Sequence, residues 1–247
     1  MSKGVILVDF DNAFYGCEMN GSMIRAQISS FIDQAKDDMT DMEQLEVRLY
    51  GGWRGNAVFT QKADILHSEV EVMNSELFPF VLDKHLVHGN VSLVTSLFGV
   101  EYVWENTFQE KSGIHRLNVR KIDGPKCASE SSRCPIHLIS KATKNRDVMC
   151  PVEECGYIDF SQLVRMEQKM VDSMMVCDIL EYTKDKEYGL VTVVSDDVDL
   201  HPALVLAGQN YLEKSLCQLK LMINNRKMHS NYKKLLGNYH IQVELWD

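Results

Sequence analysis

The stretch "YGLVTVVSDDVDLHPAL" (residues 188–204) decides the fold that we expect. Its first eight residues, 188–195, form a nearly continuous apolar run, which is typical of a strand buried on both faces of a sheet. An apolar segment at 199–209 has Pro202 in the first turn of a predicted helix, where the missing N–H does no harm. Three acids stand between the strand and the helix: Asp196, Asp197 and Asp199.

Strands alternate with helices along most of the rest of the chain. Further strands are expected at residues 4–10, 45–53, 90–98, 114–122, 215–223 and 239–246, with a short helix between the last two. Further helices are expected at residues 22–36, at 60–83 with a break at Pro79, and at 160–184. This order predicts an α/β fold with a mostly parallel sheet and helices on both faces, in three layers.

The composition indicates a globular protein of one domain. The chain has 247 residues, of which 45% are hydrophobic and 25% are charged, so it can form a sizeable core. It contains no apolar run of about 18 residues, and we therefore expect no association with a membrane. The start, "MSKGVILVDFDNAF", is a poor signal peptide and a good first strand, which predicts a cytoplasmic protein.

Acids are expected to gather at one edge of the sheet. Asp9 and Asp11 end the first strand, and the three acids at 196–199 end the strand at 188–195. If these two strands are neighbours, their acids meet, because ligands of an open parallel sheet sit beyond the carboxyl ends of its strands. Carboxylate oxygens suit Mg²⁺ or Mn²⁺. The competing interpretation is that the acids are helix caps and first-turn residues.

Two further acids interrupt the predicted long helix. Asp172 and Asp178 are six residues apart, which is roughly 600° of rotation, so only one of them can face the acid cluster directly. Asp172 has Val171, Met174 and Met175 around it, and the sequence therefore predicts that it is buried rather than solvated.

Four motifs resemble those of the NYN domain, a branch of the PIN-like nuclease superfamily. They are "ILVDFDNAF" (6–14), "VRLYGGW" (47–53), "KMVDSMMVCDIL" (169–180) and "VVSDDVDLHPAL" (193–204), which occur in the order of the family and cover about residues 4–245. The resemblance implies a PIN-like, Rossmann-like fold over 1–247. It also implies a metal-dependent endoribonuclease that cleaves single-stranded or structured RNA and leaves 5′-phosphate and 3′-hydroxyl ends.

The resemblance also implies roles for individual residues. The ligands of Mg²⁺ or Mn²⁺, and so the catalytic acids, would be Asp9, Asp172, Asp197 and Asp199. Neighbours that orient substrate or water would be Asn12 and Asp178, and we add Asp11 and Asp196 as candidates for the same role because they lie beside these motifs. The chain departs from the family at Asp196, where glycine is usual, and this extra acid either alters ion binding or caps the helix.

A cysteine-rich insertion at residues 123–159 is the second departure. Cys134 and His137, and then Cys150 and Cys155, form two short pairs of soft ligands, each opened by Cys-Pro, and Cys127 can replace His137. Such pairs are typical of a structural Zn²⁺ site, whereas a loop with reduced cysteines is the alternative.

Basic residues gather in the same region. Residues 111–146 hold nine Lys or Arg against two acids, a charge of +7 in a chain of net charge −9. A basic face of this kind can neutralise RNA phosphates, although a solvated loop would have the same composition. The RNA-binding residues that we predict are Arg116, Arg120, Lys121, Lys126, Lys141, Lys144 and Arg146.

Two other functions compete with the nuclease. "VDFDNA" (8–13) is also similar to the first motif of haloacid-dehalogenase-type phosphatases, which would use Asp9 as a nucleophile. A non-catalytic RNA-binding module with a degenerate acid site is the other. A homo-oligomer or a protein partner would be a source of specificity in any of these cases.

Overall fold

The computed structural model describes residues 2–15, 20–39, 41–110, 166–210 and 217–246. The chain divides into two compact units. Unit 1 comprises Met1–Thr107 and Met170–Asp247, and unit 2 comprises Phe108–Lys169.

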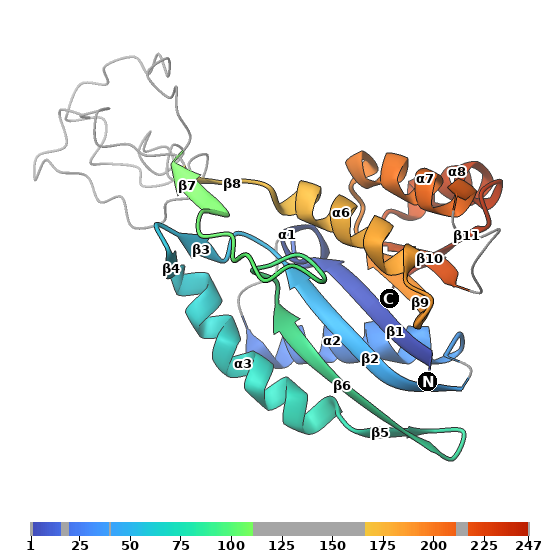
Figure 1. The fold of residues 1–247 in the computed structure, drawn as a ribbon, viewed down its shortest axis with the longest axis horizontal. Coiled ribbons are helices and arrows are strands. Elements are labelled where there is room, and N and C mark those ends of the chain that lie inside the picture. Colours follow the sequence, from blue (N-terminus) through green and yellow to red (C-terminus); the bar gives the residue numbers. More distant parts are fainter. Residues whose placement is uncertain (1, 16–19, 40, 111–165, 211–216, 247) are drawn as a thin grey trace, which may run out of the picture. The chain divides into compact units, whose positions relative to one another are not determined.

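Unit 1 is built on a seven-stranded sheet with the strand order β11-β10-β9-β1-β2-β6-β5 (Figure 1). All neighbouring strands are parallel except β5 and β6, which form an antiparallel pair. The prediction of a mostly parallel α/β sheet is therefore confirmed. The strands are β1 (Ser2–Asp9), β2 (Met42–Tyr50), β5 (Phe80–Leu82), β6 (His85–Leu93), β9 (Tyr188–Val194), β10 (Gln218–Ile223) and β11 (Ile241–Leu245).

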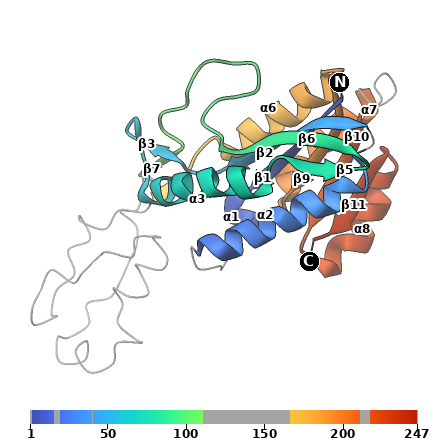
Figure 2. The same cartoon turned by 90° about the horizontal axis from the view of Figure 1, so that it is seen from below.

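Helices cover both faces of this sheet (Figures 1 and 2). The central strand β1 shows why, because its apolar run places Ile6 and Val8 in one core cluster and Val5 and Leu7 in the other, all fully buried. The first cluster is completed by α2 (Gly21–Lys36) and α3 (Gln61–Leu77). The second is completed by α6 (Val171–Lys184), α7 (His201–Asn210) and α8 (Arg226–Gly237).

Three boundaries differ from the sequence predictions. The helix expected at 160–184 begins only at Val171, because Met166–Gln168 is extended and pairs with another strand. The helix expected at 60–83 ends at Leu77, two residues before Pro79. The strand expected at 90–98 runs from His85 to Leu93, because it forms a hairpin with β5 whose turn, Asp83 and Lys84, has positive φ angles.

The described part of unit 2 is an antiparallel pair of strands, β7 (Phe108–Glu110) and β8 (Met166–Gln168). The strand predicted at 114–122 and the insertion at 123–159 lie outside the described residues. Within the part of the chain that the structure describes, no helix is long and apolar enough to cross a membrane.

Candidate metal centre

The first acid of the site is Asp9, which ends the central strand β1. It precedes the one-turn helix α1 (Phe10–Ala13), and its Oδ1 accepts a hydrogen bond from the backbone N–H of Asn12 at 3.4 Å. Its Oδ2 accepts a hydrogen bond from Ser195 Oγ at 2.9 Å. Only 6% of Asp9 is exposed, so these two donors hold a nearly buried carboxylate in one orientation.

The second acid comes from the end of β9, the strand next to β1. Ser195 Oγ accepts a hydrogen bond from the backbone N–H of Asp197 at 3.0 Å, so a single hydroxyl group joins Asp9 to this loop. Asn12 Oδ1 accepts from the backbone N–H of Asp196 at 2.9 Å and ties the two strand ends a second time. The sequence predicts this meeting of β1 and β9, and the parallel pairing confirms it.

The third acid, Asp172, lies in the first turn of α6. Carboxylate oxygens of Asp9, Asp172 and Asp197 all lie within 4.8 Å of one another. The cluster therefore combines the end of one strand, the loop after a second strand and the start of a helix. The expectation that Asp172 is buried is wrong, since the residue is exposed and the buried acid of α6 is Asp178.

Burial and the neighbouring carboxylates raise the pKa values of two acids of the cluster. Burial raises the pKa of Asp9 to about 6, with Asp172 and Asp11 adding to the rise and the bonds from Ser195 and Asn12 opposing it. The pKa of Asp172 is also raised, by loss of water around its carboxyl group and by the charges of Asp197 and Asp199. Both shifts are typical of carboxylates that share a site.

Asp199 and Asp11 lie beside this cluster rather than in it. Asp199 follows Asp197 in the 3₁₀ turn η4 (Val198–Leu200), where its backbone N–H donates to Asp197 Oδ1 at 2.9 Å. Asp11 forms an ion pair with Lys62 of α3, and the Lys62 ammonium lies 4.6 Å from the centre of the Phe10 ring. The sequence gives no signal for Lys62, because only the folded chain brings it beside the first strand.

Asp196 and Asp178 have structural partners. Asp196 Oδ1 accepts hydrogen bonds from the backbone N–H groups of Asn224 and Asn225, at 2.9 and 3.0 Å, just before α8. The extra acid thus holds the loop after β10, and it does not join the three-acid cluster. Asp178 is completely buried and bound to Arg48, Tyr50 and the backbone of Phe98. A carboxylate so placed is in no position to orient substrate or water.

The cluster fits a small divalent ion. Oxygens bound to one octahedral Mg²⁺, each about 2.1 Å away, lie about 3–4 Å apart, which is close to the 4.8 Å within which the carboxylate oxygens of the three acids lie. Asp9, Asp172 and Asp197 supply the hard oxygen donors that Mg²⁺ and Mn²⁺ prefer. Lys62 pairs with Asp11, and no ion pair to the three acids occurs within the described residues.

The other predicted sites cannot be placed in the same way. All the candidate zinc ligands (Cys127, Cys134, His137, Cys150 and Cys155) lie outside the described residues, and so do the predicted RNA-binding residues between Arg116 and Arg146.

Comparison with known proteins adds no relative. The chain matches no family model, no curated protein and no solved structure.

Proposed function

We propose that this protein is a metal-dependent endoribonuclease with a PIN-like fold, whose Mg²⁺ or Mn²⁺ site is formed by Asp9, Asp172 and Asp197, with Asp199 at its margin. One observation carries the proposal. Three carboxylates from three separate segments lie within 4.8 Å of one another at the carboxyl edge of a parallel sheet, and none of them forms an ion pair with Lys or Arg among the described residues. Asp9 and Asp197 also cap short helices, but capping does not require the three carboxylates to meet, and a bound cation would offset the cost of bringing them together.

The residues around the cluster suit phosphodiester hydrolysis. A bound divalent ion would supply an activated water and would neutralise charge on the phosphodiester oxygens. Ser195 and the N–H of Asn12 fix both oxygens of Asp9 before any ligand arrives, and such preorganisation is what a catalytic carboxylate needs. Lys62, beside Asp11, adds a positive charge near the start of α3.

RNA is the substrate class that the sequence supports. The four motifs that resemble those of the NYN domain imply RNA, and the segment at 111–146, with its charge of +7, supplies basic residues that can pair with phosphates. The acid cluster itself is chemically compatible with any phosphodiester, so the choice of RNA rests on these two features.

The test is the set of RNA ends that the purified protein makes. We expect Mn²⁺-dependent fragments of cellular RNA with 5′-phosphates, and we expect these to disappear in Asp197→Asn. Asp83→Asn is the matched control, because Asp83 is an exposed acid in the β5–β6 turn where asparagine is also tolerated at positive φ.

Two other results would redirect the proposal. Hydrolysis of small phosphomonoesters, with trapping of a phosphoryl mimic on Asp9, would identify the phosphatase. Metal-independent binding of RNA without cleavage, unchanged in Asp197→Asn, would identify a binding module.

A further inference from the structure

Helix α6 carries two aspartates that have opposite environments. Asp172, in the first turn, is exposed and belongs to the acid cluster. Asp178 lies six residues later, about 9 Å further along the helix axis, and is completely buried. One helix therefore presents one acid to the candidate metal centre and another to the interior.

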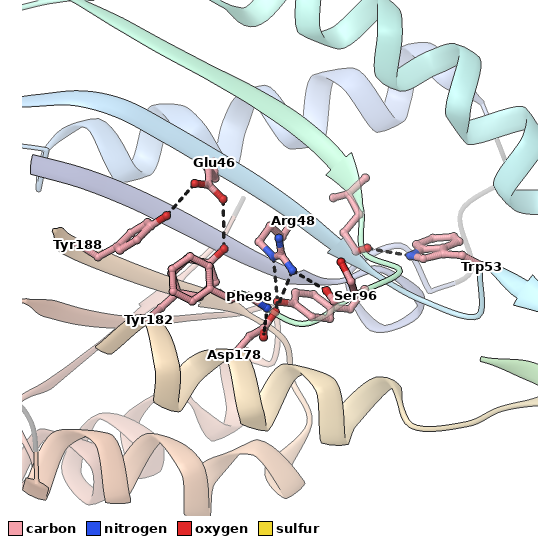
Figure 3. A network of polar contacts seen from close by, with 10 residues as sticks. Glu46, Arg48, Trp53, Ser96, Phe98, Asp178, Tyr182 and Tyr188 are labelled. Carbon is pink, nitrogen blue, oxygen red and sulfur yellow. Dashed lines mark hydrogen bonds and ion pairs between the residues drawn. The ribbon is translucent and has the colours of Figure 1, made fainter. Parts of the chain in front are cut away.

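The buried acid is fully bonded (Figure 3). Asp178 Oδ2 accepts from Arg48 Nη2 at 3.0 Å and from the Tyr50 hydroxyl at 2.5 Å, while Oδ1 accepts from the backbone N–H of Phe98 at 2.9 Å. Arg48 also donates to the carbonyl oxygen of Ser96 at 2.9 Å. Burial and the charge of Asp178 raise the pKa of Tyr50 far above its ordinary value, so its hydroxyl remains a donor.

A second anchor lies one turn further along α6. The Tyr182 hydroxyl donates to Glu46 at 3.1 Å, and Tyr188 of β9 donates to the other oxygen of Glu46 at 2.7 Å (Figure 3). Residues 178 and 182 are four apart and so lie on one face of the helix. Glu46, Arg48 and Tyr50 alternate along one face of β2, which makes this strand the fixed support for α6.

The start of α6 has little local support of its own. Met170, at the N-cap position, has φ 66° and makes no side-chain capping bond. Val171, Met174 and Met175 are buried at this end of the helix, but apolar packing is non-directional and methionine packing is adaptable, so these contacts define the rotation of the helix less sharply than hydrogen bonds do. A rotation of only about 10° would move a carboxylate at about 5–6 Å from the axis by about 1 Å, more than metal ligation tolerates.

We propose that the buried Asp178–Arg48 pair, with Tyr50, sets the rotation and axial position of α6 and thereby places Asp172 in the acid cluster. Asp178 is thus a positioning residue that acts through Asp172 and touches neither substrate nor metal. Its consequence for metal binding rests on the proposed function above.

The experiment measures Mn²⁺ affinity by titration calorimetry, well below the unfolding temperature. The principal variant is the double substitution Asp178→Asn with Arg48→Gln, which removes both charges and keeps hydrogen-bonding groups, so that neither charge is left buried alone. We expect at least tenfold weaker binding, the range found when residues that orient metal ligands are changed. The single variant Asp178→Asn should weaken binding at least as much.

The control is a second buried ion pair. Lys220 of β10 is only 2% exposed and pairs with Asp38 and Glu244, and none of these residues lies on α6. Lys220→Gln removes one charge of a buried ion pair, as the single variant Asp178→Asn does, and we expect Mn²⁺ affinity within twofold of wild type. Equal weakening in the control would show a general loss of rigidity and overturn the proposal, as would unchanged affinity in the double variant.

A failure of the proposed function can be told apart from a failure of this positioning role. If the wild type binds no Mn²⁺, the metal centre is refuted, and hydrogen exchange of the metal-free protein then tests the positioning alone. Faster exchange at residues 171–176 in the double variant, but not in Lys220→Gln, would support it. Unchanged exchange there would overturn it.

Discussion

Replacing Asp9 by asparagine should stabilise the metal-free protein while removing its metal site. The pKa of Asp9 is raised from 3.8 to about 6, mainly by burial. The folded protein therefore holds the proton of Asp9 more tightly than the unfolded chain does. This difference of about 2 pH units corresponds to about 3 kcal/mol, because each unit is worth about 1.4 kcal/mol.

The direction of this effect follows from proton binding. Well below pH 4 the carboxyl group of Asp9 is protonated in both the folded and the unfolded protein. The stabilisation of the folded protein that comes from the raised pKa is then fully present. As the pH rises from about 4 to 6, the unfolded chain loses the proton first, and the free energy of unfolding falls by about 3 kcal/mol. An asparagine side chain has no proton to lose in this range, so this part of the pH dependence should be absent from the Asp9→Asn variant.

The asparagine side chain can keep the local hydrogen bonds. Its oxygen can accept from the N–H of Asn12, and its amide can donate to Ser195 Oγ, which has a second lone pair for the N–H of Asp197. At pH 7.5 without metal, we therefore expect Asp9→Asn to be up to about 3 kcal/mol more stable than wild type.

The assay is urea denaturation with a chelator, at pH 4, 6 and 7.5, and again with Mn²⁺ at pH 7.5. A ligand at 100 times its Kd should stabilise the wild type by about 2.7 kcal/mol, and this gain should be lost in Asp9→Asn. Asp83→Asn serves as the control and should follow the wild type. An Asp9→Asn protein that is no more stable at pH 7.5, or that keeps the wild-type change between pH 4 and 6, would refute the reasoning.

Three further predictions concern the rest of the site and unit 2. Ser195→Ala should destabilise the fold by about 1–3 kcal/mol and raise the pKa of Asp9 further, because it removes a donor to a buried carboxylate. In a titration of Mn²⁺ affinity against pH, the pH at which binding is half-maximal should therefore rise. Replacing Lys141, Lys144 and Arg146 together should flatten the salt dependence of RNA affinity, by roughly 0.7 in slope for each lost phosphate contact. Elemental analysis should find one zinc per chain, and a content near zero, with all thiols titratable, would contradict the zinc site.

The sequence is sufficient to predict the sheet and its acid edge. A strand buried on both faces needs a continuous apolar run, and residues 4–10 and 188–195 are such runs. In the structure they are adjacent and parallel, so acids that follow them in the sequence must meet in space. This inference needs no side-chain detail, which is why Asp9 and the acids at 196–199 could be placed at this edge from the sequence, whereas the choice of Asp197 among them came from the resemblance to the NYN motif.

The helix acids could not be assigned in the same way. Periodicity shows that Asp172 and Asp178 point in different directions, but it does not show which direction is the interior. The apolar neighbours of Asp172 suggest burial, yet they pack on the adjacent face of the helix while Asp172 remains exposed. What decides the matter is Arg48, 130 residues away from Asp178 along the chain, whose charge makes the burial of Asp178 tolerable.

The acids crowded at residues 196–199 of the sequence are separated in the structure. Asp196 turns to the N–H groups before α8, and Asp199 lies in the turn that Asp197 caps. Only Asp197 joins Asp9 and Asp172, so charges adjacent in sequence are dispersed in space, and charges distant in sequence are gathered. The fold explains the position of Asp196, because its carboxylate accepts from two backbone N–H groups. Asp9 and Asp197 also accept from backbone N–H groups as helix caps, but capping does not require their carboxylates to converge with that of Asp172. Burial and, to a lesser extent, the neighbouring carboxylates raise the pKa values of Asp9 and Asp172. A bound cation would offset both effects, which is the physical reason to look for one there.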